Sequence, residues 1–366
     1  MKILITGGHI TPALAVADKL LQHTDIELVF VGRKYSTEGE DVSMEFKELN
    51  RRNVHFIHLS TGRLTRIASV KSLLNLLKII PGVINSFRIL QQEKPNLVLS
   101  FGGYIALPVS IAAYLRGIPV YTHEQTISPG LTNKLIAYFC KKIFISFDET
   151  KHNFKGRKTV LTGNPVRESI YKVIKKSFDL ERELPVIYIT GGSLGAHSIN
   201  THIETILQPL LEKYIVVHQV GNVKEYDDLS RLETLSKTFP DLLQNRYCVV
   251  EHIMEDELGY ILQKADLVIG RSGANTFFEL LSLEKPAIFI PLPWSANGEQ
   301  QKHAEIFENA GCGKIFYQNE GSQALLKMIN DIVENKEQYK KNFHKLKKLY
   351  KDNAAEEIVR HLLSSS

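Results

Sequence analysis

Short apolar runs alternate with longer amphipathic segments along most of the chain. Runs of this length that are apolar throughout are typical of strands buried on both faces of a parallel sheet. The stretches between them have room for crossover helices, so we expect an α/β architecture. The predicted strands cover residues 2–5, 27–31, 54–59, 97–100, 120–122, 142–145, 186–190, 214–219, 247–250, 267–269 and 287–290.

A weak internal repeat divides the chain. The sequence Ile-Leu-Ile-Thr-Gly-Gly at residues 3–8 returns as Ile-Tyr-Ile-Thr-Gly-Gly at residues 187–192. Each copy is an apolar strand that enters a glycine turn, as the first strand of a doubly wound unit does. We therefore predict two Rossmann-like, doubly wound domains, residues 1–164 and 165–340, facing a cleft. For the charged segment 341–366, a solvated surface helix and a helix packed back on the N-terminal domain both stay open.

Residues 95–115 carry no charged side chain, and this length is sufficient to span a bilayer. Gly102, Gly103 and Pro108 interrupt the segment, so we predict a buried strand, a glycine turn and a buried helix instead. The N-terminus has no secretory signal pattern. The chain has three widely spaced cysteines, and this odd number fits a reducing cytoplasm better than a secreted disulfide framework.

The net charge of +5, from 45 basic and 40 acidic residues, is too small to require nucleic acid as a partner. One segment, residues 61–95, is nevertheless locally basic and rich in Leu and Ile. We expect Pro81 to divide it into two short helices that bind an anionic membrane surface. A helix packed on its own sheet with a solvated basic face is the alternative. The basic residues are Arg63, Arg66, Lys71, Lys78, Arg88 and Lys94.

The turn Thr6-Gly7-Gly8-His9 joins the first predicted strand to the first helix. Thr11 suits an N-cap and Pro12 a first helical position, so we expect His9 on the turn that faces the ligand crevice of a doubly wound sheet. A nearby helix N-terminus disfavours protonation, which leaves an imidazole able to accept a proton at pH 7. A histidine that only stabilises the turn fits the spacing equally well.

Two later glycine turns have a similar setting. In residues 191–196, backbone N–H groups and the Ser193 hydroxyl can hold a phosphate, although the P-loop Lys and the Gly-x-Gly-x-x-Gly dinucleotide pattern are both missing. Residues 265–279 repeat the order of strand, turn and helix. Glu279 on that helix can accept hydrogen bonds from a ribose, or it can simply compensate the helix dipole.

Two polar clusters follow predicted strands. His123-Glu124-Gln125-Thr126 comes directly after one strand, and residues 297–301 come shortly after another. Polar groups beyond strand ends are common in binding sites, but their spacing alone assigns no role.

Motifs at residues 6–15, 101–104, 123–125, 129–133, 163–167, 191–196 and 271–274 occur in a single order. Together they resemble the MurG family of bacterial transferases. Members of this family move N-acetylglucosamine from UDP-N-acetylglucosamine to undecaprenyl-pyrophosphoryl-muramoyl-pentapeptide (lipid I) and form lipid II. Each motif is weak by itself, but the ordered set is specific.

The resemblance implies a GT-B glycosyltransferase with the lipid acceptor on the N-terminal domain and the nucleotide sugar on the C-terminal domain. It implies that Ser193 contacts the diphosphate, Glu279 the ribose and Gln300 the sugar hydroxyls. Arg167 and the backbone near Ile253 correspond to the uracil side. The remaining implied substrate-binding residues are Thr6, Gly7, Gly8, Thr126, Ala274, Asn275 and Thr276.

The implied reaction is an inverting, single displacement at the anomeric carbon of the donor. His9 is the expected base, and Glu124 is its rival. Helix N-termini and Ser193 stabilise the UDP leaving group, so the resemblance requires no metal and no cofactor. The expected location is the cytoplasmic face of the cell membrane, with peripheral attachment.

This chain departs from the family in two places. The first glycine loop is shorter than the family's Gly-Gly-Thr-Gly-Gly-His, and Thr126 stands where the family has Asn. Two other functions therefore stay open: a catalytically impaired homologue that binds a UDP-sugar, and a GT-B transferase with another glycolipid acceptor.

Overall fold

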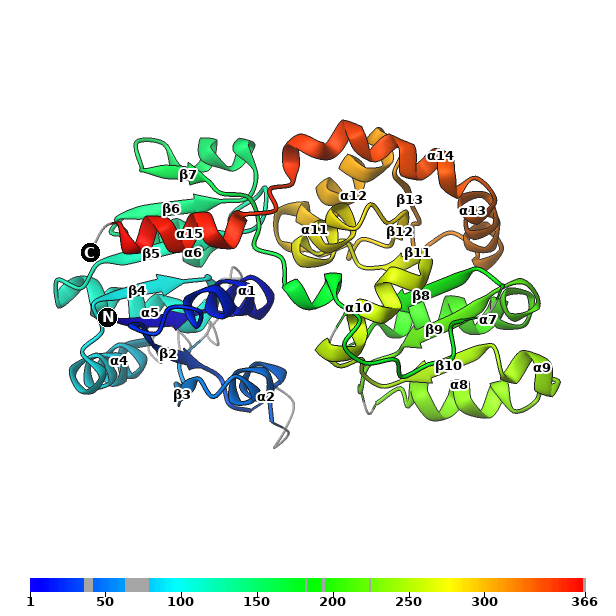
Figure 1. The fold of residues 1–366 in the computed structure, drawn as a ribbon, viewed down its shortest axis with the longest axis horizontal. Coiled ribbons are helices and arrows are strands. Elements are labelled where there is room, and N and C mark those ends of the chain that lie inside the picture. The colour runs from blue at the N-terminus through cyan, green and yellow to red at the C-terminus, as the bar shows by residue number, and fades with distance from the viewer. Residues whose placement is uncertain (36–41, 63–78, 182, 193–194, 224, 365–366) are drawn as a thin grey trace. The chain divides into compact units, whose positions relative to one another are not determined.

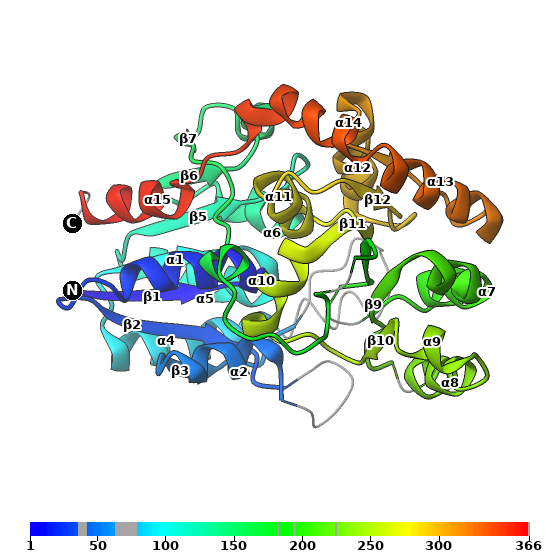
Figure 2. The ribbon, with the colours of Figure 1, turned by 45° about the vertical axis from the view of Figure 1, so that its right-hand side comes forward.

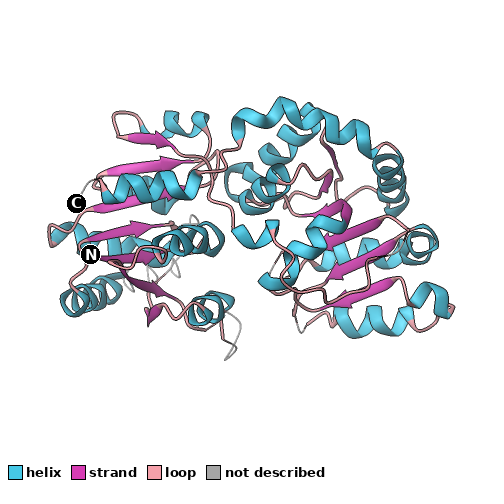
Figure 3. Cartoon of the chain, in the orientation of Figure 1, coloured by secondary structure: helices cyan, strands magenta, loops and turns pink. Residues whose placement is uncertain are grey.

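A computed structural model describes all of the chain except residues 36–41, 63–78, 182, 193–194, 224 and 365–366. The chain forms two compact units, which we call the N-unit (Met1–Arg167 and Lys351–Ser366) and the C-unit (Glu168–Tyr350). Each unit is built around its own parallel sheet (Figure 1) with helices packed against it (Figure 3).

The N-unit sheet has seven strands in the order β3-β2-β1-β4-β5-β6-β7, and every pairing is parallel. The strands are β1 (Lys2–Thr6), β2 (Glu27–Gly32), β3 (His55–His58), β4 (Leu97–Ser100), β5 (Val120–Glu124), β6 (Lys142–Ile145) and β7 (Thr159–Leu161). The helices are α1 (Ile10–Leu20), α2 (Met44–Arg51), α4 (Ile79–Glu93), α5 (Gly103–Leu115), α6 (Leu131–Ile136), η1 (Asp148–Phe154) and α15 (Ala354–Leu363).

The C-unit sheet has six parallel strands in the order β10-β9-β8-β11-β12-β13. The strands are β8 (Val186–Thr190), β9 (Ile215–Gln219), β10 (Tyr247–Val250), β11 (Ala265–Gly270), β12 (Ala287–Phe289) and β13 (Gly313–Ile315). The helices are η2 (Glu168–Tyr171), α7 (His197–Lys213), α8 (Asp228–Ser236), α9 (Asp241–Gln244), α10 (Glu255–Lys264), α11 (Ala274–Ser282), η3 (Ala296–Gly298), α12 (Glu299–Ala310), α13 (Ser322–Glu334), α14 (Lys336–Lys341) and η4 (Asn342–Leu349).

The two sheets share one winding pattern, and the repeated hexapeptide lies at the same place in both. It forms β1 in the N-unit and β8 in the C-unit, each at the centre of its sheet. The strand order reverses beside these strands, between β1 and β4 and between β8 and β11. Ligands of doubly wound sheets bind at the carboxyl ends of the strands at such a reversal.

The expected α/β class with two doubly wound parallel sheets is therefore confirmed. Two edge strands, β7 and β13, were not expected. Each has only three residues, which is too short for an apolar run to stand out from the sequence.

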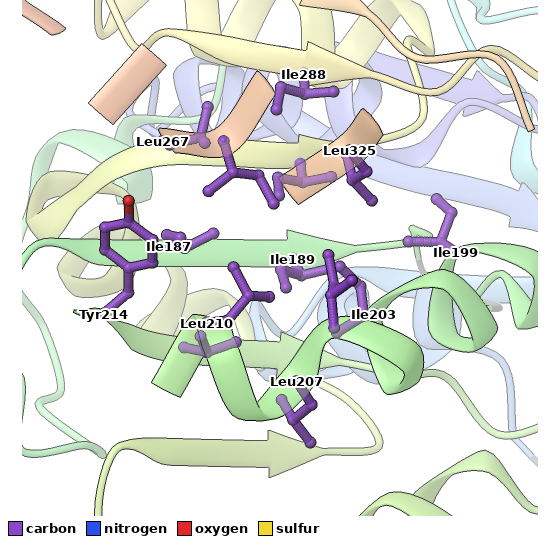
Figure 4. Close-up of a cluster of buried hydrophobic side chains, with 14 of the residues drawn as sticks. Ile187, Ile189, Ile199, Ile203, Leu207, Leu210, Tyr214, Leu267, Ile288 and Leu325 are labelled. Atoms are coloured by element: carbon purple, nitrogen blue, oxygen red, sulfur yellow. The ribbon is translucent and has the colours of Figure 1, made fainter. Parts of the chain in front are cut away.

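The apolar strands are buried because helices cover both faces of each sheet. In β1, Ile3 and Ile5 join a core formed with α1 and α15, while Leu4 joins a separate core formed with α4 and α5. In the C-unit, Ile187 and Ile189 of β8 pack against the apolar face of α7 (Figure 4). Because side chains alternate between the two faces of a sheet, one strand contributes residues to two separate cores.

The uncharged segment from residue 95 forms strand β4, a glycine turn and the buried helix α5, as predicted. No helix among the described residues has the length and apolar character needed to cross a membrane. Pro81 lies in the first turn of α4, so within the described residues it does not divide a helix. Most of the basic segment before it lies outside the described residues.

The C-terminal helix α15 is part of the N-unit. It lies along α1 (Figures 1 and 2), where Ile358 and Leu362 are fully buried in the same core as Ile3 and Ile5. An ion pair between Lys19 and Glu356, 2.6 Å apart, borders this contact. The chain therefore returns to the N-unit after building the whole C-unit.

We expect Ile358→Ala to lower the free energy of unfolding by about 2–5 kcal/mol, because it leaves a cavity in a core that α15 and α1 share. Arg360→Ala on the exposed face of the same helix is the control and should cost at most about 1 kcal/mol. Urea unfolding followed by circular dichroism measures both. Equal losses in the two variants would show that α15 is not a core element.

Candidate functional site

In the N-unit, the turns after β1 and β4 meet backbone to backbone at the strand reversal. The Gly8 N–H donates a hydrogen bond of 2.9 Å to the Gly102 carbonyl. Gly103 has a φ of +79°, and a Cβ there would lie 2.8 Å from the Gly8 nitrogen. Only glycine fits this close approach. It lets the first turns of α1 and α5 begin at the same edge of the sheet.

His9 lies at the N-cap position of α1, and its side chain makes no capping hydrogen bond. The helix begins at Ile10, so the expectation that Thr11 is the N-cap is wrong. His9 is exposed, whereas Thr6 and Gly7 beneath it are buried and form the base of the turn. Desolvation lowers the pKa of His9, and the negative charge of Glu124 acts in the opposite direction. A neutral imidazole at pH 7 follows.

Glu124, the last residue of β5, is buried, and both oxygens of its carboxylate accept hydrogen bonds. Oε1 accepts from the Thr126 N–H at 2.9 Å and from the Thr126 hydroxyl at 2.7 Å. Oε2 accepts from the Asn133 amide at 2.8 Å and from the Gly130 N–H at 3.3 Å. A carboxylate held this way fixes the loop between β5 and α6. Its two oxygens accept these four hydrogen bonds, so Glu124 is an internal support of the site edge.

His123 precedes this carboxylate and is also buried. Burial lowers the pKa of His123 to about 4, so its imidazole is neutral at pH 7. Its Nε2 lies 3.3 Å from both the Gly163 carbonyl and the Ser146 hydroxyl. His123 therefore ties β5 to the ends of β6 and β7. Arg167, the last residue of the N-unit's first segment, follows Gly163 closely and is half-buried.

In the C-unit, two helices begin at the strand reversal. Helix α7 follows the glycine turn after β8, and α11 follows Arg271, Ser272 and Gly273 after β11. The N-cap residues Ala196 and Gly273 provide no side-chain cap. Their first N–H groups are available to an anion, which the helix dipole also favours. Ser193 lies outside the described residues.

At this edge the structure adds Arg271, to which the sequence analysis assigns no role, and describes the surroundings of Asn275, an expected substrate-binding residue. Arg271 donates to the Ile290 carbonyl at 2.9 Å and to the Ser198 hydroxyl at 3.0 Å, which ties the turn after β11 to the end of β12 and to the first turn of α7. Burial lowers the pKa of Arg271, but a guanidinium starts so far above neutrality that it stays charged. Asn275 Oδ1 is buried and accepts no hydrogen bond from any described residue. The position of Arg271 directly after an apolar strand is the sequence signal that could have indicated it.

The other predicted donor-site residues lie around the same edge. Ala274, Asn275 and Thr276 form the first turn of α11, and Glu279 follows on its second turn with 8% of its surface exposed. Gln300, at the start of α12, accepts a hydrogen bond from the Leu292 N–H through Oε1 at 2.9 Å. Its amide nitrogen has no partner among the described residues. Ile253 lies in the loop after β10 and is buried.

Across the described part of the chain, no group of three or more His, Cys, Asp or Glu side chains is placed to hold a metal ion. The polar groups at the C-unit edge are instead helix N-termini, a guanidinium, amides and one carboxylate. This set of groups suits a ligand that carries both phosphate and hydroxyl groups.

Comparison with family models defines the class of protein. The glycosyltransferase family 28 N-terminal domain matches residues 6–145, and the glycosyltransferase family 28 C-terminal domain matches residues 186–358. The chain belongs to glycosyltransferase family 28.

Individual relatives narrow the class to the MurG family. The chain is 37% identical to the UDP-N-acetylglucosamine–N-acetylmuramyl-(pentapeptide) pyrophosphoryl-undecaprenol N-acetylglucosamine transferase of Clostridium perfringens strain SM101, over 92% of each chain. It is 34% identical to the transferase of the same name from Clostridium novyi, over 94% of this chain and 93% of that one. The crystal structure of Acinetobacter baumannii MurG matches 99% of each chain at 25% identity, with a TM-score of 0.71.

A UDP-GlcNAc 2-epimerase from Neisseria meningitidis, solved with UDP-GlcNAc bound, has the same fold. Its TM-score is 0.68 at 19% identity over the full length of both chains. At this identity the likeness concerns the fold alone, because one fold carries many chemistries.

Proposed function

We propose that this protein transfers N-acetylglucosamine from UDP-N-acetylglucosamine to lipid I and forms lipid II. The observation that carries this proposal is similarity along almost the whole chain to transferases named for that reaction. The two site edges support it, since each has the type of group that its substrate requires.

The donor binds at the C-unit edge. The N-termini of α7 and α11, Arg271 and the Ser193 hydroxyl hold the diphosphate. Glu279 accepts hydrogen bonds from the ribose, and Gln300 donates its amide N–H groups to sugar hydroxyls. The uracil side belongs to the backbone near Ile253 and to Arg167. Ala274, Asn275 and Thr276 provide the backbone of the first turn of α11, and the unpartnered Asn275 Oδ1 accepts from the nucleotide.

The acceptor binds at the N-unit edge, where the first turns of α1 and α5 receive its pyrophosphate. Gly8 belongs to this surface, while Thr6, Gly7 and Thr126 shape it from beneath. His9 takes the proton of the acceptor hydroxyl as that oxygen bonds to the anomeric carbon of the donor. The bond from that carbon to UDP breaks at the same time, and UDP leaves with the electron pair. Attack opposite the leaving group inverts the anomeric configuration.

The charge that develops on UDP is stabilised by groups that are already oriented. Helix N-termini and Arg271 need no rearrangement when the leaving group becomes more negative, which is the basis of electrostatic catalysis. Glu124 acts indirectly, because its hydrogen bonds hold the loop after β5. Its negative charge also raises the pKa of His9, against the lowering by desolvation.

The acceptor's lipid tail requires attachment to a membrane surface, and the outer sides of α4, α5 and α6 support it. Helices α4 and α6 both pack against α5, and the three helices expose Ile80, Ile84, Tyr114, Leu115 and Leu135. Exposed basic residues accompany them at Arg88, Lys94, Arg116 and Lys141. Apolar side chains flanked by cations suit the interface of an anionic bilayer. The enzyme therefore acts peripherally, at the cytoplasmic face where its nucleotide substrate is present.

We expect Glu279→Ala to weaken UDP binding about tenfold or more, because losing a hydrogen bond to a charged group costs on the order of 1.5–3 kcal/mol. UDP should also bind more tightly than thymidine diphosphate, which lacks the ribose 2′-hydroxyl. Isothermal titration calorimetry measures both effects. Glu233→Ala on the exposed face of α8 is the control and should bind UDP like the wild type. Equal affinity of Glu279→Ala and the wild type would remove Glu279 from the site.

His9→Ala should lower kcat by about 100- to 10,000-fold, the usual contribution of a general base, and leave the Kd of UDP unchanged. Release of UDP with a synthetic lipid I analogue as acceptor measures turnover. His23→Ala, an exposed histidine of the same unit, is the control and should remain active. Near-normal turnover in His9→Ala would transfer the role of the base to Glu124 or to water.

The double variant Ile80→Ser and Ile84→Ser should sediment less with anionic liposomes than the wild type does. Each substitution removes an exposed apolar side chain from α4. Leu242→Ser is the control, since Leu242 is more exposed than either isoleucine but belongs to the C-unit. High salt should also weaken sedimentation. Equal sedimentation with neutral vesicles would argue against the electrostatic part of the attachment.

A further inference from the structure

Gln219 is the last residue of β9, and its side chain is buried with 5% of its surface exposed. Its amide nitrogen donates a hydrogen bond of 2.9 Å to the Gly192 carbonyl. Its amide oxygen accepts from the Ile253 N–H at 3.3 Å and from the Tyr188 hydroxyl at 3.3 Å. One side chain thus joins the glycine turn after β8 to the loop after β10.

These partners determine the orientation of the amide. The oxygen faces two donors, and the nitrogen faces a carbonyl. A flipped amide would place its N–H groups against the Ile253 N–H and its oxygen against the Gly192 carbonyl, which would lose both backbone contacts. Gln219 is therefore a specific connector, and an apolar residue of similar size cannot replace it.

The two segments that Gln219 joins are those proposed to hold opposite ends of the nucleotide. The Gly192 carbonyl also accepts from the Gly195 N–H at 3.0 Å, and the Gly192 N–H donates to Thr190 Oγ1 at 3.0 Å. The carbonyl that Gln219 holds is thus part of the turn that leads into α7. On the other side, the Ile253 N–H belongs to the loop proposed for the uracil side.

We propose that Gln219 is a positioning residue for the donor, which sets the diphosphate turn and the nucleobase loop at the spacing that UDP requires. This inference rests on the proposed function of the C-unit edge. Gln219 itself is buried beneath the two segments and acts through them. Because Gln219 orders both loops before the ligand binds, the free-energy cost of ordering them does not weaken binding. Gln219 should therefore affect ligands that span both loops more than ligands that touch one.

The test uses the full chain and three variants. Gln219→Ala removes all three contacts. Gln219→Glu keeps an acceptor for the Ile253 N–H and the Tyr188 hydroxyl, but it places a carboxylate against the Gly192 carbonyl. Tyr214→Phe is the matched control, because it removes a partly buried hydrogen bond to Asn330 from the same unit, away from the site edge. Calorimetry gives the Kd of UDP, displacement of UDP gives that of uridine, and thermal unfolding reports stability.

For Gln219→Ala we expect the Kd of UDP to rise at least tenfold and the preference for UDP over uridine to shrink at least fivefold. In Gln219→Glu, uridine should bind within threefold of the wild type while UDP binding falls as in Gln219→Ala. The KM for UDP-N-acetylglucosamine should rise in both variants, with kcat at saturating donor within threefold. Tyr214→Phe should keep the wild-type Kd values.

Binding of UDP within twofold of the wild type in Gln219→Ala or in Gln219→Glu would overturn the proposal. So would equal losses for UDP and uridine that follow the loss of thermal stability, since that result indicates a purely structural residue. A wild-type protein that does not bind UDP would instead contradict the donor site itself and, with it, this inference.

Discussion

Backbone crowding at the strand reversals is the constraint on which both site edges depend. A Cβ on Gly270, at the end of β11, would lie 2.5 Å from the Thr190 carbonyl oxygen of β8, and a Cβ on Gly103 would lie 2.8 Å from the Gly8 nitrogen. Because these positions carry no side chain, neighbouring turns can pack directly against one another. Helices then begin at the ends of the central strands, where their free N–H groups favour an anion.

Each unit adds a buried polar side chain at the end of a strand to hold the loops around this edge. Glu124 ends β5 and accepts from backbone and side-chain donors of the following loop. Gln219 ends β9 and bonds to the backbone of two loops from neighbouring strands. Buried groups of this kind must find partners, so their hydrogen bonds select one loop arrangement. The loops are thus held by a carboxylate in the N-unit and by an amide in the C-unit.

The fold alone does not determine which reaction a protein catalyses. A UDP-GlcNAc 2-epimerase has the same two-unit fold at 19% identity, whereas transferases of one named activity match at 34% and 37% identity over 94% and 92% of the chain. The difference between such proteins lies in which side chains occupy the carboxyl ends of the strands. Arg271, Asn275 and Glu279 at the C-unit edge, and His9 at the N-unit edge, are therefore the residues on which the proposed chemistry depends.

The sequence by itself determined the α/β class, the two doubly wound sheets and the turns where the site residues lie. Apolar runs and glycine turns are local signals, and they report burial and backbone shape directly. The sequence did not indicate β7 and β13. Each has three residues and pairs at a sheet edge through backbone hydrogen bonds, which leave no pattern of apolar side chains. The sequence also placed the start of α1 too late, at a threonine that suits an N-cap.

Only the tertiary structure decided which polar residues are held as internal supports by hydrogen bonds from distant parts of the chain. The family resemblance makes Glu124 a rival base, whereas in the structure its carboxylate accepts hydrogen bonds from the following loop and from α6. Gln219 meets partners 27 and 34 residues away, and α15 completes a core begun by β1 at the other end of the chain. Such contacts depend on how distant segments pack, and a local pattern of side chains does not contain that information.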